Sequence, residues 1–132
     1  DHQRTEKRLS EADGFIDHER FAEEVMNPLE KKIPFTYQAY DCTSKIMSER
    51  FVKSDFEVCI IEGAYALREA FQPVYDLKVL VLIDDKRQLS RIESRNHPGL
   101  AERFKQEWIP KENRYIDHFN LEDIADIVIM VE

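Results

Sequence analysis

The run Val58-Cys59-Ile60-Ile61 leads directly into Glu62 and Gly63, and residues that can start a helix follow. An apolar run with almost no alternation is typical of a strand covered on both faces, as in a parallel sheet. We therefore predict a strand over residues 57–62, with Glu62 at its carboxyl end. In open α/β sheets ligands bind at that edge, where a carboxylate needs a cation, a metal or good donors. Glu62 could equally cap the next helix or pair with a nearby arginine.

Two further apolar runs predict strands, and helical patterns separate them. The predicted strands cover 77–83 and 126–131, and the predicted helices cover 64–72 before Pro73, 86–96, and 100–119 with an interruption at Pro110; a turn is expected at Pro98-Gly99. The order is strand, helix, strand, helix, helix, strand. It predicts an α/β fold, a parallel sheet with flanking helices and right-handed crossovers.

The residues before this region predict one clear helix. Asp17 is a favoured N-cap residue, and apolar side chains then recur every four positions from Phe21 to Leu29. This pattern predicts a helix over residues 18–32, bent or ended by Pro28. The other ranges are an exposed segment at 1–14, a short edge strand or ordered loop at 33–40, and a polar, turn-like stretch at 41–55.

Length and charge narrow the class of protein. The 132 residues suffice for one domain with a core, and the net charge of −8 argues against a general nucleic-acid binder. No apolar run approaches the ~20 residues that a membrane helix needs, and the polar start does not resemble a signal peptide. The two cysteines, Cys42 and Cys59, have no metal-type spacing. Cys59 is expected in the core, and a cytoplasmic location is expected.

Arginines recur on the helix predicted after the second strand. Arg87, Arg91 and Arg95 are four residues apart, which places them on one face. This face could be a solvated one that pairs with acids such as Glu93. It could also act as a flap that closes on phosphates, because the planar guanidinium binds phosphate oxygens in pairs. The helix leaves the sheet edge predicted to carry Glu62, which favours the second interpretation.

Other candidate ligand contacts lie earlier in the chain. Asp17-His18 opens a helix, and a carboxylate there could bind sugar hydroxyls as well as cap the helix. Tyr37 and Tyr40 could stack on a planar ligand, although aromatic residues in such a segment are more often part of the core.

Taken together, several of these motifs resemble the uridine kinase family, within the uridine kinase and phosphoribulokinase superfamily of P-loop kinases. The motifs are Asp17-His18, Pro34-Phe35-Thr36-Tyr37, Ile61-Glu62-Gly63, Tyr75-Asp76-Leu77-Lys78, the helix from Arg91 to Arg95, and Ala125-Asp126-Ile127-Val128-Ile129. Each motif is weak by itself. Their order and spacing cover nearly the whole chain.

The resemblance implies a phosphotransferase that moves the γ-phosphoryl group of ATP or GTP, with Mg²⁺, to the 5′-hydroxyl of uridine or cytidine. It assigns Glu62 to the metal, Asp17 and His18 to the ribose, and Tyr37 to the wall of the base pocket. Three arginines would contact the transferring phosphates, with Arg87 at the nucleotide and Arg91 and Arg95 as catalytic lid residues. Phosphoryl transfer depends on such positioning and charge stabilisation.

The chain departs from the family pattern in several places. No Gly-x-x-x-x-Gly-Lys-Ser/Thr loop occurs, since the three glycines are Gly14, Gly63 and Gly99. Asp1 lacks the aromatic residue that follows the family's general base, so we do not assign it that role. Tyr40-Asp41-Cys42 also stands where the family usually has a histidine, and Ile92 follows Arg91.

From these departures we predict that residues 1–132 form a single partial kinase domain, P-loop kinase-like and incomplete at its N-terminus, that is inactive alone. Two alternatives stay open. One is a non-catalytic relative that binds a nucleoside or metabolite. The other is a kinase of another acceptor, such as a sugar phosphate or pantothenate. The expected partner is a small acceptor rather than a nucleic acid or a membrane, and a homo-oligomer stays open.

Overall fold

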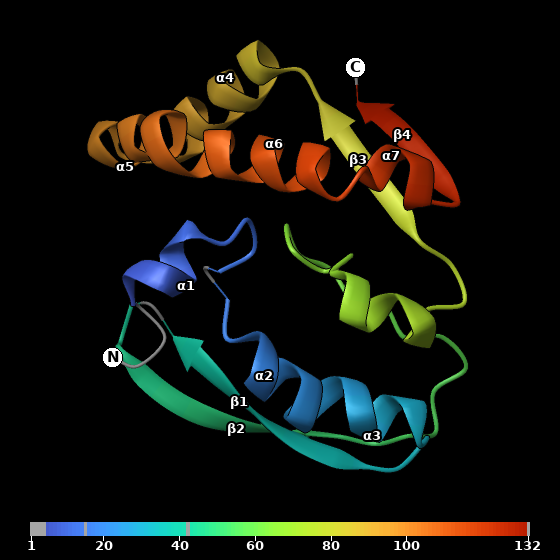
Figure 1. The fold of residues 1–132 in the computed structure, drawn as a ribbon. Coiled ribbons are helices and arrows are strands. Elements are labelled where there is room, and N and C mark those ends of the chain that lie inside the picture. Colours follow the sequence, from blue (N-terminus) through green and yellow to red (C-terminus); the bar gives the residue numbers. More distant parts are fainter. Residues whose placement is uncertain (1–4, 15, 42, 132) are drawn as a thin grey trace.

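The computed structural model describes residues 5–14, 16–41 and 43–131, so that Asp1, Phe15 and Cys42 lie outside the described residues. The chain forms a mixed α/β arrangement with two small sheets (Figure 1). In chain order the elements are α1 (Glu6–Ser10), α2 (His18–Phe21), the π-helix η1 (Ala22–Met26), α3 (Asn27–Glu30), β1 (Phe35–Asp41), β2 (Ile46–Val52), the 3-10 helix η2 (Glu69–Val74), β3 (Val79–Ile83), α4 (Asp85–Arg95), α5 (Pro98–Arg103), the π-helix η3 (Phe104–Trp108), α6 (Ile109–His118), α7 (Leu121–Ile124) and β4 (Ile127–Val131).

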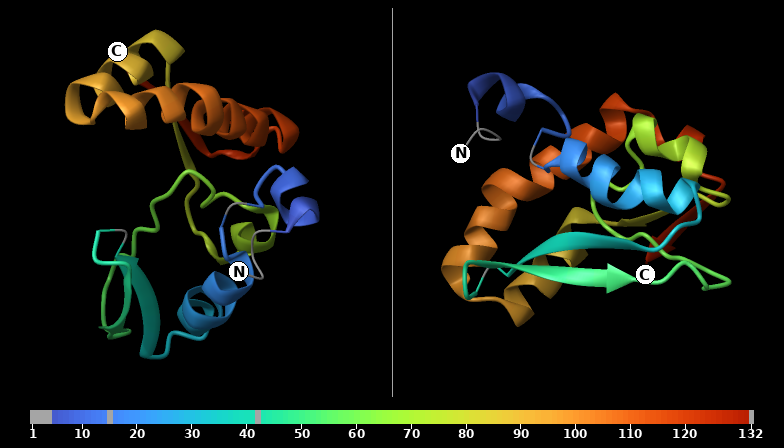
Figure 2. Two further views of the ribbon diagram at one scale, coloured as in Figure 1. Left: turned by 90° about the vertical axis from the view of Figure 1, so that its left-hand side faces the viewer. Right: turned by 90° about the horizontal axis from the view of Figure 1, so that it is seen from below.

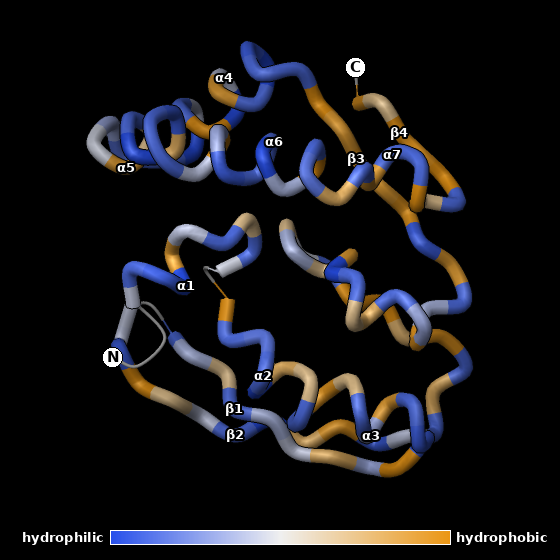
Figure 3. The backbone as a smooth tube through the Cα atoms, viewed as in Figure 1, coloured by the Kyte–Doolittle hydropathy of each residue, from blue (hydrophilic) through white to orange (hydrophobic). Residues whose placement is uncertain are grey.

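β3 and β4 form a parallel pair, which confirms the strands predicted from their apolar sequences. Figure 3 shows hydrophobic residues concentrated along both strands. The chain between them runs through α4 to α7, because parallel strands need a long crossover connection. The main-chain N–H of Lys78 donates to Asp126 Oδ2 at 2.8 Å, which ties the two strands together where they begin.

A core cluster packs against this sheet and is centred on Tyr115. The Tyr115 side chain is fully buried and joins Leu80 of β3 and Leu121 of α7. Its ring meets the rings of Tyr65 and Phe119 edge-on, at centroid distances of 4.9 and 5.2 Å. Burial raises the pKa of the Tyr115 hydroxyl. α6 is therefore held to the sheet mainly through one aromatic side chain.

The second sheet is an antiparallel hairpin of β1 and β2. At its turn the Asp41 carboxylate accepts the main-chain N–H of Thr43 at 2.7 Å, and Lys45 adopts a φ of 59°. The helical run α2–η1–α3 lies along the hairpin in Figures 1 and 2. A strand at 33–40 was one of our two expectations and is confirmed. The turn-like assignment of 41–55 was wrong for β2, whose side chains are mostly exposed and lack a clear apolar face.

The strand predicted at 57–62 is not formed. Residues 57–62 lie outside any strand, Cys59 is exposed, and Val58 and Ile60 are 75% and 85% exposed. An apolar run becomes a strand only beside a neighbour that completes its hydrogen bonds, and the four described strands pair among themselves. The described residues thus make two separate sheets rather than the single parallel sheet of a P-loop kinase-like fold, and that part of our fold prediction was wrong.

Two predicted helix boundaries also need correction. The helix expected at 64–72 is a turn followed by η2, a 3-10 helix that contains Pro73. The turn expected at Pro98-Gly99 is the start of α5, where Nδ1 of His97 accepts the main-chain N–H of Gly99 at 3.2 Å. Proline suits this first helical turn because its N–H would have no partner there.

Both π-helices end shortly before a proline. η1 precedes Pro28 and η3 precedes Pro110, and both prolines lie at the start of the next α-helix. In each case the residue before the proline bonds five residues back, as with Ile109 N–H to the carbonyl of Phe104. Proline cannot donate within a helix and collides with the preceding turn. The wider π turn accommodates it, so the helices predicted over 18–32 and 100–119 continue past their prolines.

The segment after α1 was predicted to be exposed, but its end is buried. Ala12 and Asp13 have 8% and 5% of their surface exposed. The Asp13 carboxylate pairs with the Arg68 guanidinium, which comes from the segment before η2. Burial lowers the pKa of Arg68. A paired charge is tolerated in such a position, where an isolated one would not be.

Candidate functional site

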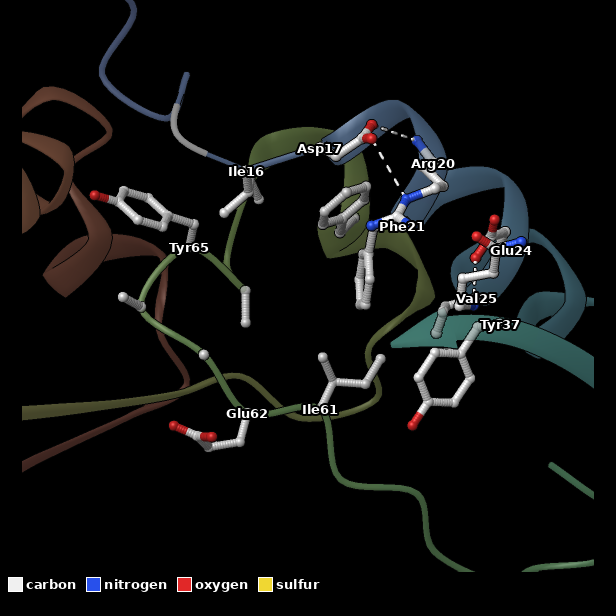
Figure 4. A pocket seen from close by; sticks show the side chains of 15 residues that line it. Ile16, Asp17, Arg20, Phe21, Glu24, Val25, Tyr37, Ile61, Glu62 and Tyr65 are labelled. Carbon is white, nitrogen blue, oxygen red and sulfur yellow. Dashed lines mark hydrogen bonds and ion pairs between the residues drawn. The ribbon is translucent and has the colours of Figure 1, made fainter. Parts of the chain in front are cut away.

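A cavity of about 300 Å³ lies between α2, η1, β1 and the segment at 61–66, and we call it the Asp17 pocket (Figure 4). Its apolar and aromatic walls include Ile16, Phe21, Val25, Ile61, Tyr65 and Phe71. Its polar lining residues are Asp17, Arg20, Glu24, Tyr37, Gln38 and Glu62. An apolar cavity with a few polar groups is the usual form of a small-molecule site.

Asp17 lies at the pocket where α2 begins. One of its carboxylate oxygens accepts the main-chain N–H of Arg20 at 3.2 Å, which confirms the predicted N-cap. The other oxygen is 3.4 Å from Nε of Arg20. These contacts fix the direction of the carboxylate at the pocket wall. Each oxygen can still accept a further hydrogen bond from a ligand hydroxyl.

Tyr37 reaches the pocket from β1, and Glu24 fixes that strand to the helix. Oε2 of Glu24 accepts the main-chain N–H of Gln38 at 2.8 Å. This bond joins η1 to the residue that follows Tyr37. Figure 4 shows the Glu24 carboxylate and the Tyr37 side chain on the same side of the pocket, with the Tyr37 ring extending away from the carboxylate.

Glu62 and Tyr65 line the opposite side. Glu62 is exposed, whereas Tyr65 is half-buried against Tyr115, and burial raises its pKa. Within the described ranges no group of three or more acidic, histidine or cysteine side chains could hold a metal ion. Mg²⁺ is commonly bound through one or two carboxylates together with substrate phosphates. Glu62 supplies one exposed carboxylate, and Figure 4 shows it directed away from the centre of the cavity.

His18, which we predicted beside the substrate, is not among the lining residues of the pocket. Its side chain faces α1 instead. Nδ1 of His18 is 2.9 Å from a terminal nitrogen of Arg8, and Nε2 is 3.2 Å from Glu19. The Arg8 guanidinium also forms hydrogen bonds with Glu19 and lowers the pKa of that carboxyl to about 2. His18 thus helps to hold α1 against the start of α2.

The three predicted phosphate-binding arginines lie on α4. None of them lines the Asp17 pocket, and Figure 1 shows α4 at the opposite end of the molecule from α2 and β1. Arg87 forms an exposed ion pair with Asp84, with its Nε at 3.2 Å from the carboxylate. The structure therefore places Asp17, Tyr37 and Glu62 in the lining of one cavity, but Arg87, Arg91 and Arg95 do not line it.

Sequence reasoning did not assign Arg20, Glu24 or Tyr65 to the site. One signal was present for two of them. Arg20 and Glu24 follow Asp17 at three and seven residues, a spacing that places side chains on one helix face. Tyr65 carried no such signal, because its position depends on the fold around Tyr115.

Comparisons with protein-family models, curated proteins and solved structures find no match for this chain. Among the described helices, none has the length and apolar composition that spanning a membrane requires.

Proposed function

We propose that the Asp17 pocket binds the nucleoside acceptor of a uridine kinase-like phosphotransferase. The observation that supports this proposal is that Asp17, Tyr37 and Glu62 all line one cavity. They come from three separate stretches of sequence, and the family resemblance assigns each of them to the acceptor or to the metal.

The proposed roles follow from the chemistry of each side chain. The Asp17 carboxylate accepts hydrogen bonds from the ribose hydroxyls, and the Tyr37 ring packs on the base. The acceptor's 5′-oxygen then forms a bond to the γ-phosphorus of ATP or GTP, while the bond from that phosphorus to the β,γ-bridging oxygen breaks. ADP or GDP is released, and the hydroxyl proton passes to solvent. Glu62 would hold Mg²⁺, which supplies neutralisation of the phosphate charge.

The spacing along α4 is what supports a phosphate-binding role for Arg87, Arg91 and Arg95. Residues four apart on α4 share a helix face, and guanidiniums are suited to phosphate oxygens. In a productive complex the phosphates would have to meet this face. The proposed nucleoside site does not depend on whether the phosphates reach this face of α4.

The charges of the pocket favour a neutral acceptor. Three acids, Asp17, Glu24 and Glu62, line it together with one cation, Arg20, and Asp17 already pairs with that cation. A sugar phosphate or pantothenate would bring a further negative charge against these carboxylates, which is unfavourable. A nucleoside carries no such charge and offers hydroxyl donors.

The second candidate is a non-catalytic nucleoside-binding protein. It is favoured by the sequence, which contains no Gly-x-x-x-x-Gly-Lys-Ser/Thr loop to hold a triphosphate. Calorimetry with a nucleoside and with ATP separates the two candidates. A kinase binds both ligands, whereas the binding protein binds only the nucleoside.

Replacing Asp17 with asparagine is expected to weaken nucleoside binding by about tenfold or more, because it removes a charged acceptor from the hydroxyls. Asparagine is an equally good N-cap, so α2 should persist. Isothermal titration with uridine and cytidine measures the effect. The matched control is Asp84→Asn, at the N-cap of α4 outside the pocket. Unchanged affinity in D17N, or no binding by the unmodified protein, would contradict the proposal.

Glu62→Gln tests the metal role. In a preparation that phosphorylates the nucleoside, we expect this change to lower turnover at fixed magnesium by about tenfold or more. Raising the magnesium concentration should restore part of the lost turnover, because a site of lower affinity becomes occupied at higher metal concentrations. Equal turnover of the variant and the original protein would remove Glu62 from the metal site.

A further inference from the structure

We propose that Glu24 makes the Asp17 pocket selective for a nucleoside whose base carries an exocyclic amino group, as cytosine does, over one with a carbonyl there, as in uracil. This inference rests on the proposed function and names the acceptor class more closely. It assigns a role to a side chain that the kinase resemblance does not use.

The geometry places the Glu24 carboxylate beside the proposed base wall. Its Oε2 accepts the main-chain N–H of Gln38 at 2.8 Å, directly after Tyr37 in β1. Among the described residues, none donates to the other oxygen, Oε1. A base that stacks on the Tyr37 ring with its edge toward η1 would present that edge to a carboxylate that has one oxygen available.

An ionised carboxylate can only accept hydrogen bonds. The amino group of a cytosine-type base donates two, whereas the carbonyl of a uracil-type base is another acceptor and would face the carboxylate without a proton between them. The cation of the pocket, Arg20, is held at Asp17 through its Nε, which is 3.4 Å from that carboxylate. A polar group left without a partner in a binding site weakens binding much more than a lost methyl group does.

The first experiment compares cytidine with uridine by isothermal titration on the unmodified protein and on Glu24→Gln. Cytidine should bind the unmodified protein about tenfold or more tightly than uridine. Glutamine keeps a carbonyl oxygen for the Gln38 N–H and adds an amide that can donate to a carbonyl. In E24Q the preference should shrink to within about threefold. Glu23→Gln is the control, because Glu23 is an exposed neighbour on η1 outside the pocket, and it should keep the full preference.

A ligand-side experiment does not depend on the folding of any variant. N4,N4-dimethylcytidine lacks both amino hydrogens, and it should bind the unmodified protein no better than uridine. If it binds as tightly as cytidine, or if uridine equals or exceeds cytidine, the inference about Glu24 is wrong while the nucleoside pocket stands. If neither cytidine nor uridine binds, the proposed function itself fails.

Discussion

Replacing Tyr115 with alanine is expected to lower the free energy of unfolding by about 3–5 kcal/mol, the usual effect of removing a large buried aromatic side chain. Tyr115 is fully buried, and its ring packs between Tyr65 and Phe119. Its loss would leave a cavity between α6 and the sheet of β3 and β4. Tyr65 would also lose its support at the wall of the Asp17 pocket.

Urea denaturation followed by circular dichroism measures this change. Tyr115→Phe should cost less than about 1 kcal/mol, because the hydroxyl makes only a long hydrogen bond of 3.4 Å, to the carbonyl of Tyr65. Tyr40→Ala is the control for losing an aromatic ring at the surface, since Tyr40 is 54% exposed. A loss in Y115A no larger than that in Y40A would show that Tyr115 does not organise the core.

Replacing Arg68 with alanine is expected to lower the free energy of unfolding by about 2–4 kcal/mol. The reason is the carboxylate left behind, because Asp13 has a side chain only 6% exposed and would lose its counter-ion. Removing one partner of a buried pair is strongly destabilising for this reason. Arg68 itself is 22% exposed, so we expect less than the full effect of a deeply buried pair.

A double variant separates the charge from the packing. With Asp13→Asn present, the further change at Arg68 should cost clearly less, because no buried charge is abandoned. Arg87→Ala is the matched control, since its ion pair with Asp84 has both side chains about half exposed and should contribute less than about 1 kcal/mol. If R68A and R87A have equal effects in the same urea titration, the buried pair does not stabilise the fold.

Patterns carried by neighbouring residues predicted much of the local structure. The apolar runs at 77–83 and 126–131 form β3 and β4, and the helix predicted at 86–96 is α4, capped by Asp84. Asp17 caps α2 as its residue type and position predicted. The helix and the cap were predictable because their hydrogen bonds join residues that are close in sequence. The two strands were predictable because each has an equally apolar partner.

The wrong predictions concern features that depend on distant partners. The run at 58–61 is wholly apolar, as β3 is, but no described strand pairs with it. Asp13 sits in a polar sequence and is buried only because Arg68 meets it from 55 residues away. Within the candidate site, sequence reasoning selected Asp17, Tyr37 and Glu62, all of which line the pocket. It could not find that Glu24 is fixed to the main chain of β1, because that contact joins a helix to a strand.

The exposed run before Glu62 has a consequence for the integrity of the chain. Proteases bind their substrates as extended strands, and loops with exposed, unpaired backbone are where folded proteins are cut. Val58 and Ile60 present bulky side chains outside any strand. A single cut there would leave Asp17 and Tyr37 on one fragment and Glu62, Tyr65 and Tyr115 on the other. The two walls of the pocket would then hold together by non-covalent contacts alone.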